Sequence, residues 1–333
     1  MRVAVIGAGS WGTAIAQLLA TGGHEVALWA RREEVARAIN ECHANPSYLV
    51  DAPLSERIMA TSSHAEALAN AEAAVVVTPS AALRETARAL APFASESLPL
   101  IVCSKGVEEG SGLLPIEVLA SEMGHPERIA VLSGPNHAEE VVRGLFAASV
   151  VASSDRATGE FFQKLFATET FRTYVSDDAC GVELCAAFKN VIAIAVGLSY
   201  GLGFGDNTAA LLMTRGLAEM SRLVAACGGA PITCMGLAGA GDLIATCTSE
   251  HSRNRRFGLM VAQGKTLDDF TAETHMVAEG ALACKTLGTL AQRHAVELPI
   301  TEVVRGVVWE GLDVREAARD LAARPLTEEF YGI

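Results

Sequence analysis

A glycine-rich turn stands directly after the first apolar run of the chain. Residues 7–12 (GAGSWG) follow the strand-like residues 2–6 and precede a helical pattern over 11–21. In a dinucleotide-binding unit the first glycine permits a tight turn, the second lets a pyrophosphate approach the backbone, and the third allows close packing of helix and strand. The helix N-terminus then offers unpaired N–H groups to the anion. We therefore predict that Gly7, Gly9 and Gly12 form a cofactor-binding loop rather than an incidental turn.

The first half of the chain alternates between strand-like and helical patterns, which predicts a parallel, doubly wound sheet. After about residue 178 only long helical patterns follow, and Asn207 and Thr208 could cap the second of them. We expect an α/β fold with a Rossmann-like sheet domain over 1–178 and an all-helical domain over 179–333. The expected strands are 2–6, 25–29, 73–78, 99–104, 129–133 and 147–152, with a short one at 171–175. The expected helices include 11–21, 32–41, 80–91, 180–198, 207–226, 254–263, 277–293, 300–309 and 313–323.

Charge and composition exclude several classes of partner. The net charge is -13 and there is no long basic tract, so a nucleic-acid partner is not expected. The apolar run at 182–200 contains Glu183 and Lys189, which argues against a membrane span. The eight cysteines show no C-x-x-C spacing, so we expect reduced thiols in a cytoplasmic protein, with neither a disulfide frame nor a metal site. No signal peptide is expected, because the glycine loop interrupts the first apolar stretch.

The end of the second strand bears on the choice of cofactor. NAD-binding folds often carry an acidic residue there that contacts the ribose 2′-hydroxyl. This chain has Arg31 and Arg32 instead, and guanidinium groups can bind a 2′-phosphate. The pattern predicts NADP, or use of both NADP and NAD. The alternative is that both arginines are the solvated start of the next helix, beside Glu33 and Glu34.

Two lysines are candidates for the chemistry. Lys105 follows the apolar run 101–103, where the carboxyl end of a strand opens on the ligand crevice of such a sheet. Lys189 stands in a long apolar helix, and a buried lysine requires a partner. Desolvation would suit it to proton transfer. The alternative, a lysine whose ammonium extends to solvent, stays open on this pattern alone.

A basic cluster follows the second long helix. Residues 252–256 (SRNRR) place three arginines at a helix start, where they oppose the helix dipole unless an anion is bound. We expect anion binding there, although a solvated helix end would give the same pattern. Residues 239–242 (GAGD) predict a flexible turn, and the carboxylate of Asp242 could bind substrate hydroxyls or orient a lysine.

Several motifs together resemble the bacterial-type NAD(P)-dependent glycerol-3-phosphate dehydrogenases. They occur in order along the chain, and the last is highly specific. These motifs are GAGSWGTA at 7–14, SKG at 104–106, SGP at 133–135, FKNVIA at 188–193, TRGLAEM at 214–220, GDL at 241–243, and TCTS at 246–249 followed by SRNRRFG at 252–258.

The resemblance implies interconversion of sn-glycerol 3-phosphate and dihydroxyacetone phosphate, and so supply of phospholipid precursors. It implies that Lys189 is the proton acceptor. Substrate-binding positions would be Lys105, Gly134, Asn136, Lys189, Asp242, Ser252, Arg253 and Asn254. Cofactor-binding positions would be Ser10, Trp11, Arg31, Arg32, Tyr48, Lys105, Ala138, Arg253, Val277 and Glu279, in addition to the loop glycines. Asn136 departs from the hydroxyl residue that many relatives carry, and the resemblance assigns no catalytic role to His137 or His251.

Two other functions share some of these features. A dehydrogenase of hydroxy acids or sugar acids would have the same architecture but would not need the cluster at 252–256. A nucleotide-sensing protein would bind the cofactor without turnover and would not need Lys189 or Asp242. A homodimer is considered, but the residues leave the oligomeric state open.

Overall fold

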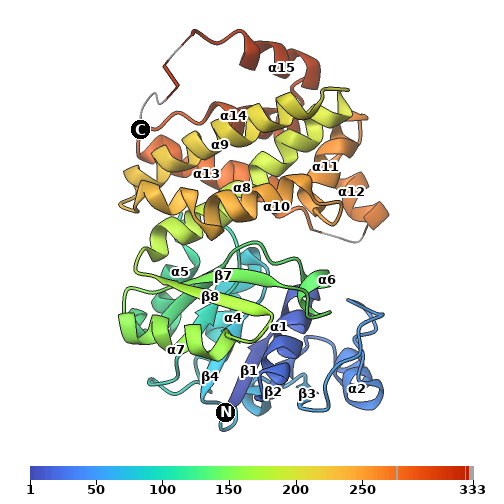
Figure 1. Cartoon of the computed structure of the whole chain (residues 1–333), viewed down its shortest axis with the longest axis vertical. Coiled ribbons are helices and arrows are strands. Elements are labelled where there is room, and N and C mark those ends of the chain that lie inside the picture. The colour runs from blue at the N-terminus through green and yellow to red at the C-terminus, as the bar shows by residue number, and fades with distance from the viewer. Residues whose placement is uncertain (275–276, 327, 330–333) are drawn as a thin grey trace. The chain divides into compact units, whose positions relative to one another are not determined.

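The computed structural model describes residues 1–274, 277–326 and 328–329. Contacts within the chain divide it into two compact units, whose elements are labelled in Figure 1. Residues 1–105 and 113–179 form the sheet unit, and residues 106–112 and 180–333 form the helical unit. Residues 106–112 group with the helical unit although they lie between two parts of the sheet unit in the sequence. The sequence pattern did not indicate this. Arg293 holds this segment by donating to the carbonyl oxygens of Ser111 at 2.7 Å and Gly110 at 3.1 Å.

The sheet unit contains an eight-stranded sheet in its described residues, with the order β3-β2-β1-β4-β5-β6-β7-β8. All neighbouring strands are parallel except β6 and β7, which are antiparallel. The expectation of a parallel sheet is therefore wrong at that one pair. The strands are β1 (Arg2–Ile6), β2 (Glu25–Trp29), β3 (Ile58–Thr61), β4 (Ala73–Val76), β5 (Leu100–Val102), β6 (Ile129–Ser133), β7 (Ala147–Ala152) and β8 (Phe171–Ser176).

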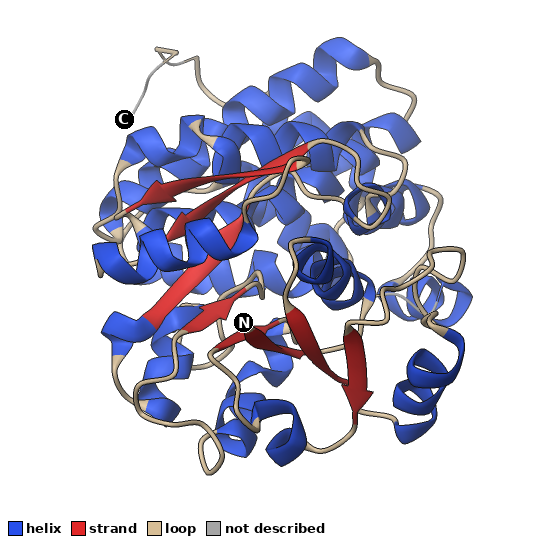
Figure 2. Cartoon of the chain, turned by 60° about the horizontal axis from the view of Figure 1, so that its bottom comes forward, coloured by secondary structure: helices blue, strands red, loops and turns tan. Residues whose placement is uncertain are grey.

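Helices cover both faces of this sheet (Figure 2). The central strands β1 and β4 are buried almost throughout, as expected for apolar runs covered on two sides. Helices α1, α6 and α7 pack together, and so do α3, α4 and α5. The helices are α1 (Ser10–Thr21), α2 (Glu33–Cys42), α3 (His64–Leu68), α4 (Leu83–Leu90), α5 (Pro115–Met123), α6 (Ala138–Val141) and α7 (Arg156–Phe166).

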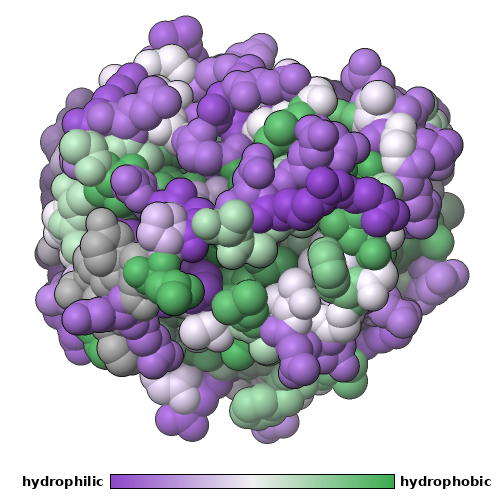
Figure 3. All heavy atoms as spheres, turned by 90° about the horizontal axis from the view of Figure 1, so that it is seen from above, coloured by the Kyte–Doolittle hydropathy of each residue, from purple (hydrophilic) through white to green (hydrophobic). Residues whose placement is uncertain are grey.

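The helical unit contains no strand in its described part. Its helices are α8 (Ala179–Gly201), α9 (Asp206–Ala226), α10 (Asp242–Thr248), α11 (Arg253–Ala262), α12 (Leu267–Thr274), α13 (Glu279–Arg293), α14 (Pro299–Trp309) and α15 (Val314–Ala322). Figure 3 views the molecule from above and shows apolar side chains scattered among hydrophilic ones on that face. Exposed apolar side chains of this unit include Leu211, Ile232 and Met235.

Helix α9 differs from the expectation at its N-terminus but not at its C-terminus. Gly205 is its N-cap, so Asn207 and Thr208 lie in the first turn and the predicted cap is wrong. The predicted end at residue 226 is confirmed: the helix ends at Ala226, and Gly228 adopts φ +87°. Gly229 N–H then donates to the Val224 carbonyl oxygen at 2.9 Å, which closes the last turn.

Helix α8 is long and mostly apolar. Among the described residues, it is the one helix long and apolar enough to cross a membrane. However, 89% of that stretch is buried inside the protein. Burial on all sides explains why the helix has almost no polar face.

Candidate active site

The glycine loop between β1 and α1 has the geometry expected from its sequence. Gly7 has φ +125°, and a Cβ atom there would lie 2.6 Å from the Val77 carbonyl oxygen. A Cβ atom on Gly12 would lie 1.8 Å from the Gly7 carbonyl oxygen. Neither position can accept a side chain without moving backbone: Gly7 lies against the backbone that follows β4, and Gly12 lies against the loop itself.

The middle glycine of this loop faces open space. A Cβ atom on Gly9 would meet no heavy atom of the described structure within 4 Å. Gly9 is also the N-cap of the 12-residue helix α1, whose N-terminus carries the positive end of the helix dipole. Nearby, the buried indole Nε1 of Trp11 has no hydrogen-bond partner among the described residues. An open backbone, a helix N-terminus and an unpaired donor together suit the phosphates of a dinucleotide.

The two arginines after β2 occupy different environments. Arg31 is exposed. Arg32 Nη2 donates to Ser47 Oγ at 2.7 Å, while its Nε lies 3.7 Å from Glu34 Oε1. Arg32 thus takes part in a solvated pair at the start of α2 and also contacts the loop that carries the half-exposed Tyr48.

Polar residues lie at or just after the carboxyl ends of β4, β5 and β6. Thr78 and Ser133 have buried hydroxyl groups without a hydrogen-bond partner among the described residues. Ser104 Oγ donates to the Thr78 carbonyl oxygen at 2.5 Å, immediately before the half-buried Lys105. Burial raises the pKa of the preceding Cys103 to about 12, while Lys105 acts in the opposite direction. Cys103 is therefore a neutral thiol at neutral pH, not a nucleophile.

The segment after β6 is shaped by Gly134. This residue has φ +150°, and a Cβ atom there would lie 2.9 Å from both the Ala148 carbonyl oxygen and Ser149 Cα. Asn136 Nδ2 donates to Ser149 Oγ at 2.7 Å, which fixes the amide. Ala138 is buried and is the first residue of α6. The predicted residues 134, 136 and 138 thus belong to one short, well-packed turn.

Lys189 is buried in α8, which decides between its two interpretations. The residue is 6% exposed, and its Nζ donates to Asp242 Oδ1 and, at 3.1 Å, to Thr246 Oγ1. The alternative of an ammonium extending to solvent is therefore wrong. Asp242 is only 3% exposed, so the ion pair lies in a water-poor environment. Thr246 was not among the predicted site residues. It lies one turn after Asp242 on α10, and this spacing could have identified it.

The turn before Asp242 is helical, so the predicted flexible turn is wrong. Leu237–Gly241 form a π-helical turn that runs directly into α10. A Cβ atom on Gly239 would lie 2.1 Å from the Cys234 carbonyl oxygen, so this glycine serves packing. π-Helical turns are rare and often occur at functional sites. Here the turn presents the Asp242 carboxylate to Lys189.

The basic cluster begins α11 and is tied to two other helices. Ser252 is the N-cap, and its Oγ accepts from Arg255 N at 3.2 Å, while Arg253 is exposed in the first turn. Asn254 is buried: its Nδ2 donates to Asn190 Oδ1 at 3.0 Å, and its Oδ1 accepts from Gly280 N at 2.9 Å.

This buried amide network orders the candidate residues beside it. Lys189, Arg253 and Glu279 each immediately precede a member of the network in the chain. Glu279 is half-buried at the start of α13, and Val277 is exposed just before it. The network therefore fixes the relative positions of three predicted ligand-binding segments within the helical unit.

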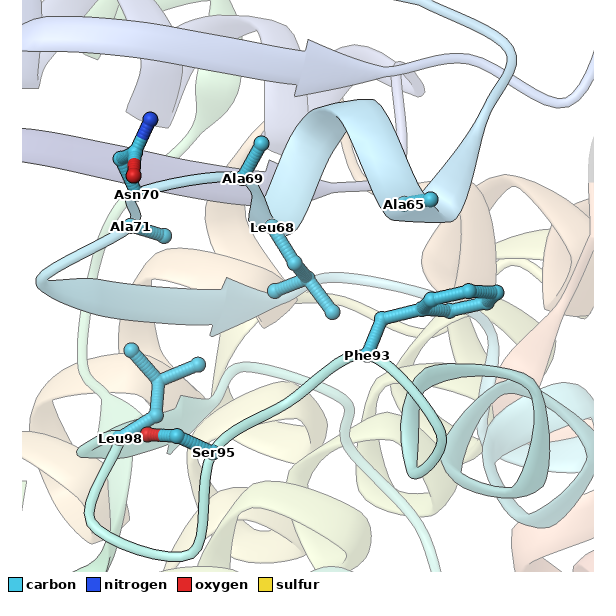
Figure 4. Close-up of a pocket in the computed structure, with 8 residues that line it drawn as sticks. All are labelled: Ala65, Leu68, Ala69, Asn70, Ala71, Phe93, Ser95 and Leu98. Carbon is cyan, nitrogen blue, oxygen red and sulfur yellow. The ribbon is translucent and has the colours of Figure 1, made fainter.

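Within the described residues, three other features were compared with this site. Across residues 1–274, 277–326 and 328–329, no group of three or more His, Cys, Asp or Glu side chains could hold a metal ion. Burial raises the pKa of Cys247, next to the Lys189 pair, to about 12, so its thiol is neutral. A hollow of about 360 Å³ is lined by residues of the sheet unit (Figure 4). Its residues Ala71 and Leu98 precede β4 and β5, so it lies at the amino ends of the strands, away from the glycine loop.

Comparison with known proteins agrees with both units. Residues 2–159 match the family model for the N-terminus of NAD-dependent glycerol-3-phosphate dehydrogenase, and residues 178–319 match the model for its C-terminus. A glycerol-3-phosphate dehydrogenase [NAD(P)+] of Pelotomaculum thermopropionicum is 46% identical over 100% of this chain and 96% of its own. One of Corynebacterium aurimucosum is 48% identical over 97% of this chain and 98% of its own.

A solved structure extends this agreement to the fold. The crystal structure of glycerol-3-phosphate dehydrogenase from Coxiella burnetii has a TM-score of 0.92 and 38% identity, covering 97% of this chain and 99% of that one. The motifs, the fold and the buried Lys189–Asp242 pair thus occur in a chain whose whole length is similar to one group of enzymes. The chain belongs to the NAD-dependent glycerol-3-phosphate dehydrogenase family.

Proposed function

We propose that this chain interconverts sn-glycerol 3-phosphate and dihydroxyacetone phosphate with NADP(H) or NAD(H). The observation that carries the proposal is the buried Lys189, held by Asp242 and Thr246 in a mostly apolar helix. Burying a charged side chain costs free energy, so a buried lysine indicates a role that packing alone does not provide. Proton transfer at a secondary alcohol is such a role.

Lys189 handles the proton in both directions. In oxidation, neutral Lys189 Nζ takes the proton from the hydroxyl oxygen at C2 of glycerol 3-phosphate while a hydride leaves C2. In reduction, the ammonium donates that proton to the ketone oxygen of dihydroxyacetone phosphate. When bound, the nicotinamide supplies the hydride acceptor in oxidation and the hydride donor in reduction. Asp242 and Thr246 hold Nζ at one place, which lowers the cost of orienting it.

The phosphate of the substrate needs a basic site in this acidic protein. Arg253 is an exposed cation in the first turn of α11, next to the capping hydroxyl of Ser252. Asn254 is fixed by the amide network and still has a second N–H on Nδ2. We assign these residues to phosphate binding, with Lys105, Gly134 and Asn136 completing the contacts with the substrate.

The cofactor is assigned to the glycine loop and to the residues around it. Gly7, Gly9, Ser10, Trp11 and Gly12 would hold the pyrophosphate at the N-terminus of α1. The remaining assigned contacts are Arg31, Arg32, Tyr48, Lys105, Ala138, Arg253, Val277 and Glu279. Arg31 and Arg32 favour NADP through its 2′-phosphate, while NAD is also accepted. We also propose that the protein is cytoplasmic and forms a homodimer.

An absorbance assay tests this function. Dihydroxyacetone phosphate should oxidise NADPH or NADH, and unphosphorylated dihydroxyacetone should not. Lys189→Ala should lose about 10²–10⁴-fold in kcat, the usual contribution of a general acid or base. Lys164→Ala, which removes an exposed lysine of α7, is the matched control and should keep its rate. Near-normal turnover by a folded Lys189→Ala variant would exclude the assigned base.

The same assay separates the alternatives. Turnover of hydroxy acids without turnover of glycerol 3-phosphate would indicate another dehydrogenase of this architecture. Cofactor binding without turnover of either would indicate a nucleotide sensor. The buried Lys189–Asp242 pair favours the dehydrogenase over the sensor, because a sensor needs no proton acceptor.

A further inference from the structure

A buried asparagine bonds to both the glycine loop and the first turn of α1. The Asn45 side chain belongs to a residue with 0% exposure, and its Nδ2 donates to the Ala8 carbonyl oxygen at 3.0 Å. The same nitrogen donates to Thr13 Oγ1 at 2.8 Å. An asparagine amide has two N–H donors, so both are used to hold the loop and the helix that follows it.

The other end of this amide shapes the loop at 45–48. Asn45 Oδ1 accepts from the backbone N–H groups of Ser47 at 3.0 Å and Tyr48 at 3.1 Å. Ser47 Oγ in turn accepts from Arg32 Nη2 at 2.7 Å. One buried side chain therefore joins the glycine loop to a loop that contacts the predicted 2′-phosphate arginine.

The bond to Ala8 has a direct consequence for the next peptide group. The Ala8 carbonyl and the Gly9 N–H belong to the same planar trans peptide, so they point in opposite directions. Fixing the carbonyl toward Asn45 directs the Gly9 N–H away from Asn45. A Cβ atom on Gly9 would meet nothing within 4 Å, so no described side chain crowds that side of the residue and an anion can approach the turn there.

We propose that Asn45 is a positioning residue for the dinucleotide, and that it sets the orientation of the Gly9 amide and of the 45–48 loop together. The proposal rests on the proposed function, because it assumes that this loop binds NADP(H) or NAD(H). The proposal gives Asn45 no role in substrate binding or in proton transfer. Its loss should therefore weaken cofactor binding and leave the chemical step largely intact.

Two variants separate the two ends of the amide. Asn45→Leu removes all four hydrogen bonds while keeping a side chain of similar size. Asn45→Asp keeps the acceptor for Ser47 and Tyr48 but cannot donate to Ala8, and it places a carboxylate near the cofactor phosphates. Both should raise the Kd and KM for NADPH and NADH by about tenfold or more, with kcat changed less than about threefold.

The chain offers a matched control in Asn40. Its Nδ2 donates to the Ala60 carbonyl oxygen at 2.9 Å and its Oδ1 accepts from Ala60 N at 2.7 Å, which joins α2 to β3. Asn40→Leu thus also removes an amide that bonds to backbone in the sheet unit, but away from the glycine loop. It should lower thermal stability and leave the cofactor Kd within about twofold.

Cofactor Kd is measured by nicotinamide fluorescence without substrate, and kcat and KM by absorbance. A cofactor Kd that is unchanged in both Asn45 variants, or raised equally in Asn40→Leu, would overturn the proposal. Wild-type protein that binds NADPH but does not reduce dihydroxyacetone phosphate would defeat the proposed function alone, since the Kd comparison still applies. Wild-type protein that binds neither cofactor would overturn both. If Asn45→Leu does not fold, Asn45→Asp decides the outcome.

Discussion

Replacement of Lys189 by methionine tests whether the buried pair is both an ion pair and the catalytic group. Methionine has similar length and no charge, so Lys189→Met leaves the Asp242 carboxylate without its cation. The two side chains are only 8% and 4% exposed, so water cannot replace the lost partner. Removing one member of a buried ion pair costs about 3–5 kcal/mol. At about 2–4 °C per kcal/mol, the melting temperature should fall by roughly 6–20 °C.

The double variant Lys189→Met/Asp242→Asn separates stability from catalysis. Neutralising the carboxylate removes the charge that Lys189 balanced, so the double variant should regain at least about half of the lost stability. Its kcat should nevertheless stay about 10²–10⁴-fold below wild type, because the proton acceptor is absent. Calorimetry and urea unfolding give the stabilities, and cofactor absorbance gives the rates.

Two results would refute the reasoning behind this pair of variants. A double variant as unstable as Lys189→Met would mean that the loss comes from packing rather than from an uncompensated charge. A double variant with near-normal turnover would mean that another group moves the proton. In the second case the buried pair would be a structural feature of the helical unit.

Three further predictions concern other parts of the structure. Gly12→Ala should abolish measurable cofactor binding or destabilise the sheet unit, because its Cβ would lie 1.8 Å from the Gly7 carbonyl oxygen; a variant with wild-type Kd and melting temperature would contradict this. Replacing Arg31 and Arg32 together by alanine should raise KM for NADPH more than KM for NADH, and equal effects would refute 2′-phosphate binding. Burial raises the pKa of Glu219 in α9 to about 7, above its ordinary value of 4.5. The folded state then binds this proton more tightly, so relative to Glu219→Gln the wild type should lose up to about 3 kcal/mol of stability between about pH 5 and 8. Urea unfolding across that range checks this, and a difference between the two proteins that does not change with pH would count against it.

The glycine loop could be predicted residue by residue because its requirements are local. A tight turn, an open backbone and a close helix–strand contact each need a glycine, and all three are within six residues of one another. Most strands were also predictable, since a buried strand needs an apolar run. The strand β3 was missed because it is a four-residue edge strand whose Met59 is 56% exposed, so its pattern is weak.

Strand direction could not be predicted in the same way. The run 147–152 has the composition of a buried strand whichever way it points, and the connection to β6 includes only the short helix α6. An antiparallel pair can form across a short connection, whereas a parallel pair needs a longer crossover. The connection here, residues 134–146, is about a dozen residues long and suits either arrangement, so its length alone did not decide the direction.

The sequence could not decide how the charge of Lys189 is balanced. Its apolar helix indicated that the ammonium needed either solvent or a partner, and no local pattern could choose between them. The partner lies 53 residues away, at the end of a π-helical turn that exists because Gly239 allows close contact with Cys234. Only the packing of α8 against α10 brings the two charges together. The residue type at 189 therefore indicated that a site exists, while the tertiary structure decided which group completes it and how far it is shielded from water.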